Sequence, residues 1–292
     1  MSAQNYREEK LSAPPSMLSG YAKAALGALP LPGSGGGKAL PRRRLTVEGH
    51  RVDTAELAEY AAACGLRLGS TLPLTYGFVL TFPSVMALLV DKSFPLPAMG
   101  MVHIRNVIDQ QRPVGVDEPL DISVWAQDLR PHDKGTQVDF VSEIRVGREL
   151  VWRQTSTFLK IGGGTGGPKK DRSDETPDYG RPVTMLRVDQ RRTDRYAAVS
   201  GDRNPIHVSK IGAKLFGFPT TIAHGMWSAA AALGAVEGRI ADRVVYDVRF
   251  GKPVILPATV AEYADRTDTG WELALRHPKK LYPYLTATLT EG

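Results

Sequence analysis

The sequence predicts an α+β protein in which one unit, helices followed by antiparallel strands, occurs twice along 292 residues. Residues 51–67 and 187–203 align without a gap, and eight of these 17 positions are identical. In both copies a helical pattern precedes segments in which apolar and polar residues alternate. A glycine-rich stretch separates the copies. Repeats of this size are domain-sized, so the sequence indicates a duplicated fold.

Composition divides the chain into four segments. Residues 1–45 are rich in proline, glycine and small side chains, and they predict an N-terminal extension with one short helix near Met17 to Leu29. Residues 46–160 predict the first unit, 161–182 a flexible linker, and 183–292 the second unit.

The first unit is expected to open with two helices. Asp53 and Glu56 have the spacing of a capping box, and Gly65 marks the end of the helix that they begin. A more apolar helix is expected from Thr75 to Leu89.

The second unit repeats this order. A helix is expected from about Asp189 to Gly201, and a long apolar helix near Ile222 to Gly238. Such an apolar helix must be buried on most sides, which a curved antiparallel sheet wrapped around it achieves.

Strands are predicted by alternation or by apolar runs after each helix pair. They are expected at 119–128, 138–146 and 149–160 in the first unit and at 271–275 and 285–289 in the second.

Charge and hydropathy narrow the classes of function. The net charge is +6, but no basic run is interleaved with aromatic residues, which argues against nucleic-acid binding. The N-terminus lacks the apolar region of a signal peptide, and the longest apolar stretch, 222–236, falls short of the roughly 18–20 residues of a membrane span. We therefore expect a cytoplasmic protein. Its positive charge is either an ordinary basic surface or an attraction to an anionic partner, such as a phosphopantetheine thioester or an acidic carrier protein.

One segment of the second unit carries chemistry that its copy lacks. Asp202, Asn204 and His207 follow Gly201, which ends a helix, and Pro205 prevents that helix from restarting. Such a constrained turn can direct an acid and an imidazole into one cavity.

The first copy is degenerate at this place, because Leu66 and Thr71 stand where the second has an acid and an imidazole.

A second element, His224-Gly225-Met226, begins the apolar helix of the second unit. A glycine at a helix N-terminus offers an unpaired N–H, which a developing oxyanion needs.

Aromatic side chains provide candidate pocket walls. Phe216 and Phe218 lie between the two motifs and suit an overhanging wall, while Tyr76 and Phe82 in the first apolar helix suit the wall of an acyl cavity. The alternative for the latter two is that they fill the core.

The run from Tyr196 to His207, followed by His224-Gly225-Met226, resembles the signature of the MaoC-like dehydratases, the (R)-specific enoyl-CoA hydratase (hydratase 2) family. From about residue 45 the whole chain resembles the double-hot-dog 3-hydroxyacyl-thioester dehydratases. The resemblance implies tandem hot-dog folds, each a long helix wrapped by an antiparallel sheet, and an N-terminal copy that has lost the motif.

The resemblance also implies a reaction and roles for residues. Asp202 and His207 would activate the water that adds to C3 of a trans-2-enoyl thioester and deliver a proton to C2, giving a (3R)-3-hydroxyacyl thioester in fatty acid metabolism. Asn204 would support the site, and the Gly225 N–H would stabilise the enolate. Apart from the resemblance, His224 and Met226 are candidate substrate-binding residues because they flank Gly225, and the alternative for His224 is that it only begins the helix. No cofactor and no metal are expected.

Other classes stay open at this point. A hot-dog thioesterase needs the same acid–base pair and oxyanion donor, and a non-catalytic acyl-binding subunit would share the fold. A metal site made of Asp202, His207 and His224 is a further alternative. The substrate carrier, coenzyme A or an acyl carrier protein, and the oligomeric state, monomer or homodimer, are also open.

Overall fold

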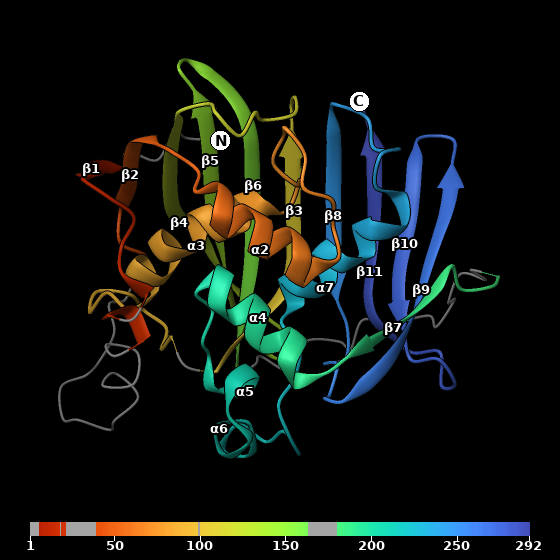
Figure 1. Ribbon diagram of the computed structural model, residues 1–292. Helices are drawn as coiled ribbons and strands as arrows, with labels where there is room; N and C mark the ends of the chain where they lie inside the picture. The colour runs from red at the N-terminus through yellow and green to blue at the C-terminus, as the bar shows by residue number, and fades with distance from the viewer. Residues whose placement is uncertain (1–5, 18, 22–38, 99, 163–179) are drawn as a thin grey trace.

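The computed structural model describes residues 6–17, 19–21, 39–98, 100–162 and 180–292. In these residues one eleven-stranded sheet spans the molecule, with the main helices gathered on one face (Figure 1). The strands are β1 (Arg7–Leu11), β2 (Arg43–His50), β3 (Met101–Gln110), β4 (Leu120–His132), β5 (Gly135–Val146), β6 (Glu149–Ile161), β7 (Thr184–Val188), β8 (Val244–Phe250), β9 (Ala258–Thr267), β10 (Gly270–Arg276) and β11 (Pro283–Glu291). The helices are α2 (Thr54–Cys64), α3 (Tyr76–Leu89), α4 (Gln190–Ser200), α5 (Pro205–Val208), α6 (Lys210–Leu215), α7 (Gly225–Leu233) and the 3₁₀-helix η1 (Gly234–Val236).

The strand order displays the duplication. The order of neighbouring strands is β1-β2-β4-β5-β6-β3-β8-β11-β10-β9-β7. The first half of the chain contributes β2-β4-β5-β6-β3. The second half contributes β8-β11-β10-β9-β7, which is the same arrangement in the opposite direction. The halves join where β3 pairs antiparallel with β8, from Arg105 opposite Arg249 to Gln110 opposite Val244. The α+β class is confirmed, and the two sheets are continuous.

The capped helices match the sequence predictions. Asp53 accepts hydrogen bonds from the N–H groups of Ala55 and Glu56 at the start of α2, and Asp189 caps α4 in the same way through Arg192. Each helix ends at a left-handed glycine, Gly65 or Gly201, where a side chain would be strained.

The apolar helices differ in length. The predicted helix from Thr75 to Leu89 is confirmed as α3, with Thr75 as its N-cap. The prediction of a long helix over 222–238 was wrong in extent, because α7 is short and continues only as η1. Its expected first residues are extended instead, since Ile222 forms a β-bridge with Ile255.

The predicted strands correspond to β4, β5, β6, β10 and β11. The extension differs from the expected arm, because β1 pairs in parallel with β2, which itself begins inside the segment 1–45. The expected helix near Met17 to Leu29 is helical at its described start, whereas 22–29 lie outside the described residues. Most of the expected linker, 163–179, also lies outside them.

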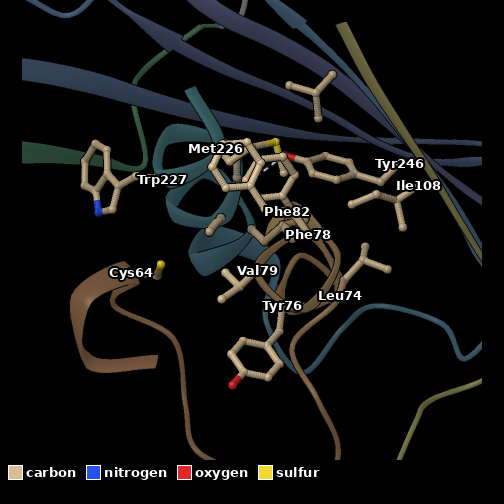
Figure 2. Close-up of a cluster of buried hydrophobic side chains, with 14 of the residues drawn as sticks. Cys64, Leu74, Tyr76, Phe78, Val79, Phe82, Ile108, Met226, Trp227 and Tyr246 are labelled. Atoms are coloured by element: carbon tan, nitrogen blue, oxygen red, sulfur yellow. Dashed lines mark hydrogen bonds between the residues drawn. The ribbon is translucent and has the colours of Figure 1, made fainter. Parts of the chain in front are cut away.

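Buried contacts hold the helices of the two halves together. The indole N–H of Trp227 on α7 donates to the Ala63 carbonyl on α2 at 3.0 Å. Within the second half, the Tyr246 hydroxyl on β8 donates to the Ala229 carbonyl on α7 at 2.8 Å. Figure 2 shows Met226 of α7 gathered with Phe78 and Phe82 of α3. Burial raises the pKa of the Cys64 thiol to about 12, so this residue fills space rather than acting as a nucleophile. Among the described helices, none has the length and apolar character needed to cross a membrane.

Candidate functional site

The loop after α4 is a tight turn that the Asp202 carboxylate stabilises by accepting a hydrogen bond from the main chain. Gly201 turns the chain in a left-handed conformation, and the Asp202 Oδ1 accepts from the Asn204 N–H at 3.2 Å. The Asn204 side-chain oxygen accepts a hydrogen bond from the Ile206 N–H and so caps the short helix α5, in which Pro205 occupies the first position. Because the turn and cap fix this backbone, Asp202 and His207 project to the same side.

Two histidines complete the cluster, and their hydrogen bonds fix their tautomers. The His207 Nδ1–H donates to the Ile222 carbonyl at 2.8 Å, so its Nε2 carries the free lone pair when the ring is neutral. The His224 Nε2–H donates to the main-chain carbonyl of Asp202 at 2.8 Å. The two rings stack with centroids 3.8 Å apart.

The electrostatics favour a carboxylate beside neutral imidazoles. Burial opposes the charge on Asp202, but the two histidines and hydrogen bonds from Tyr21 and Asn204 hold its pKa below the ordinary value. Burial lowers the pKa of His207 despite the nearby carboxylate. Burial and then His207 lower the pKa of His224 to about 3. At neutral pH, Asp202 is therefore an acceptor and His207 a base.

Gly225 begins α7 beside this cluster. As the first helical residue its N–H has no partner within the helix, and the helix dipole adds positive potential at this end. A Cβ built on Gly225 would lie 3.1 Å from Cε1 of Phe250. The glycine therefore leaves room for a ligand oxygen to approach the N–H, where a side chain would crowd.

A cavity of about 380 Å³ connects this polar cluster to the first half of the chain. Asp202, Asn204, His207, His224 and Gly225 line one end. The remainder is largely apolar and is lined from α3, β6 and β8 by Phe78, Phe82, Met86, Leu89, Phe158 and Phe250.

The structure brings together most of the residues singled out from the sequence. Met226, Phe218 and Phe82 line the cavity with the polar cluster. Tyr76 does not, because it packs edge-on against Tyr60 with ring centroids 5.0 Å apart and points away from Phe82 (Figure 2). Phe216 does not line it either, because it follows the last turn of α6 and is partly exposed.

Tyr21, His103 and Tyr196 are among the polar residues that line the cavity and that sequence reasoning missed. The Tyr21 hydroxyl donates to Asp202 Oδ1 at 2.5 Å, although Tyr21 precedes both repeats. His103 stacks on Phe158 at 4.4 Å between centroids, and its buried Nε2 has no hydrogen-bond partner in the part of the chain that the structure describes. Tyr196 contacts the His224 ring. Only Tyr196 had a signal in the sequence, because it opens the motif-bearing run.

The carboxylate and both imidazoles are also close enough to be considered as metal ligands. One ligand atom from each of Asp202, His207 and His224 lies within 4.8 Å of the others. However, one nitrogen of each ring is committed to a main-chain carbonyl, and Asp202 Oδ1 already accepts two hydrogen bonds. The hydrogen bonds of Asp202, His207 and His224 therefore suit proton transfer. That the protein needs no metal stays a prediction.

Comparison with known proteins gives concordant matches. A family model described as MaoC like domain matches residues 169–272. A Mycobacterium tuberculosis protein, 3-hydroxyacyl-thioester dehydratase X, is 47% identical over 277 residues, covering 94% of this chain and 98% of its own length. A crystal structure of HtdX from the same organism matches with a TM-score of 0.76 and 47% identity over 85% of this chain and 99% of that chain. A MaoC-like dehydratase from Phytophthora capsici matches with a TM-score of 0.67 over 85% of this chain and 95% of that chain, and at 16% identity it supports the fold alone.

Proposed function

Since the chain belongs to the MaoC-like dehydratase family and carries its hot-dog fold in tandem, we propose that it interconverts trans-2-enoyl and (3R)-3-hydroxyacyl thioesters of fatty acid metabolism. The enzyme is a hydro-lyase. One observation carries the assignment of the site: an ionised Asp202, a neutral His207 and Gly225, whose N–H has no partner within its helix, line one cavity whose remainder is largely apolar.

Hydration begins with a water held between Asp202 Oδ2 and His207 Nε2. The lone pair on His207 Nε2 takes a proton while the water oxygen bonds to C3 of the enoyl thioester. The electrons of the C2=C3 bond then move toward the thioester oxygen. The Gly225 N–H donates to that oxygen, a type of interaction worth about 3–4 kcal/mol in comparable oxyanion holes.

The second step delivers the proton to C2. The His207 imidazolium, stabilised by the Asp202 charge, returns the proton as the thioester carbonyl re-forms. Water oxygen and proton arrive from the same side of the double bond because one cluster supplies both. Dehydration is the reverse: His207 removes the C2 proton, and the C3 hydroxyl leaves as water.

The acyl chain extends toward α3. This helix belongs to the first half of the chain, which lacks the catalytic motif and supplies an apolar wall instead. Phe78, Phe82 and Met86 supply this wall, and Lys252 lines the cavity on the side of β8. A lysine there suits the phosphate groups of a carrier, which both coenzyme A and an acyl carrier protein possess. Both walls come from one chain, so we propose that a monomer is complete for catalysis.

The test uses wild-type enzyme with a short and a long trans-2-enoyl thioester, each on coenzyme A and on an acyl carrier protein. The proposal predicts loss of the enoyl chromophore without release of free thiol, and a product of 3R configuration. Thiol release would instead identify a thioesterase. Absence of turnover with all four substrates, despite binding, would identify a non-catalytic acyl-binding protein.

A further inference from the structure

A segment outside the duplicated fold reaches the catalytic cluster. Met17 packs against Gly201 so closely that a Cβ built on the glycine would lie 2.8 Å from the Met17 Cγ. Gly20 is buried near Met86, and its N–H donates to the Ser16 carbonyl at 3.1 Å. These contacts fix the turn that carries Tyr21 into the cavity.

The Tyr21 hydroxyl binds the carboxylate that the proposed reaction uses. It donates to Asp202 Oδ1 at 2.5 Å, and the Asn204 N–H donates to the same oxygen at 3.2 Å. Within the described residues, Asp202 Oδ2 accepts no hydrogen bond. The two oxygens are therefore distinct, one held by the protein and one open to the cavity.

We propose that Tyr21 is a positioning residue, whose hydroxyl anchors Asp202 Oδ1 so that Oδ2 is presented to the reacting water. The inference rests on the proposed function, since Asp202 is the group through which Tyr21 acts. Tyr21 comes from the extension and has no equivalent within either repeat, so the extension completes the site of the second half.

The chemistry of the pair agrees with this role. Burial, and then the Asp202 charge, raise the pKa of the Tyr21 hydroxyl far above its ordinary range, so it remains a donor at every pH of interest. Its hydrogen bond is one of the interactions that lower the pKa of Asp202. A donor that cannot ionise is suited to hold a carboxylate in its charged form.

The test is Tyr21→Phe, which removes the hydroxyl and keeps the ring. The matched control is Tyr6→Phe, since the Tyr6 hydroxyl, also in the extension, donates to the Ala126 carbonyl at 3.1 Å and does not line the cavity. Carboxyl ¹³C shifts of labelled aspartate, assigned with Asp202→Asn, report the Asp202 titration without catalysis, and steady-state kinetics report kcat and KM. Thermal melting shows that each variant is folded.

Tyr21→Phe is expected to raise the pKa of Asp202 by about one to two units, the strength of a hydrogen bond to a charged group. We expect kcat to fall about 10- to 100-fold with little change in KM, because the carboxylate loses its orientation. In the Asp202→Asn background, Tyr21→Phe should have no further effect, and Tyr6→Phe should match wild type throughout.

Three results would overturn the inference. An unchanged Asp202 titration in Tyr21→Phe would do so whatever the activity, which separates this test from failure of the proposed function. A rise in KM alone would mean that Tyr21 only lines the acyl cavity. An increase in kcat would mean that the hydroxyl occupies the place of the reacting water.

Discussion

Gly225 has little room for a side chain, and this gives a sharp prediction for Gly225→Ala. The added Cβ would lie 3.1, 3.2 and 3.4 Å from three atoms of the Phe250 ring. Carbon atoms prefer a separation of about 3.5–4.0 Å, so either the ring or the start of α7 must move by about 0.5 Å. The ring has limited freedom, because it packs against His103 with centroids 4.8 Å apart.

The displacement falls on the Gly225 N–H, the group proposed to stabilise the enolate. Complete loss of an oxyanion donor costs about 10²–10³ in kcat, and a misplacement of about 1 Å can cost about 10². For about half that displacement, we expect kcat of Gly225→Ala to fall about tenfold, while the fold and the 3R product are retained.

The assay is loss of the enoyl chromophore, with Gly234→Ala as the matched control. Gly234 lies at the end of the same helix in right-handed helical conformation, and among the described residues its added Cβ would approach the Gly65 carbonyl oxygen at 3.8 Å, an ordinary contact. That control should keep wild-type kcat and gain about 0.4–1 kcal/mol of stability. Wild-type kcat in Gly225→Ala, or an equal loss in Gly234→Ala, would refute the reasoning about the N–H of residue 225.

Three further predictions follow from the same site. The proposed mechanism uses His207 as a neutral base, and burial lowers its pKa, so kcat/KM for hydration should stay flat as pH falls from 7 and decline only below 6.5, the ordinary histidine value. A decline already above pH 6.5 would contradict this. Removal of metal ions with EDTA should leave the rate unchanged, whereas a loss restored by Zn²⁺ would favour the metal alternative. Met86→Trp narrows the apolar end of the cavity, so it should leave kcat/KM for short enoyl thioesters unchanged and lower it for long ones. Burial of one methylene stabilises the bound chain by about 0.8 kcal/mol, so each excluded methylene should lower kcat/KM about fourfold. Equal losses for all chain lengths would place the acyl chain elsewhere.

The sequence predicted elements whose signals are local. The caps of α2 and α4 depend on single residues, Asp53 and Asp189, and on the glycine that ends each helix. The turn that carries Asp202, Asn204 and His207 is likewise set by neighbouring residues, so its conformation was predictable from the sequence.

Elements set by tertiary contacts were missed. Strand β3 shows no alternation along its first half, because it lies at the middle of the sheet, where it pairs with both β6 and β8. The Nδ2 of its buried Asn106 donates a hydrogen bond across the sheet to the Ser156 hydroxyl at 2.9 Å. His103 and Tyr21 reach the cavity from this strand and from the extension, and no local pattern marks either as a cavity residue.

The central claim is that Asp202 and His207 add water to an enoyl thioester, and Asp202→Asn tests it most directly. Asp265→Asn removes the same charge from an exposed position on β9 and serves as the control. With a trans-2-enoyl thioester, wild type and Asp265→Asn should consume the chromophore equally and form the 3R alcohol. Asp202→Asn should be about 10²- to 10⁴-fold slower, the contribution of a positioned acid–base group. Hydration by folded Asp202→Asn at the wild-type rate would contradict the account.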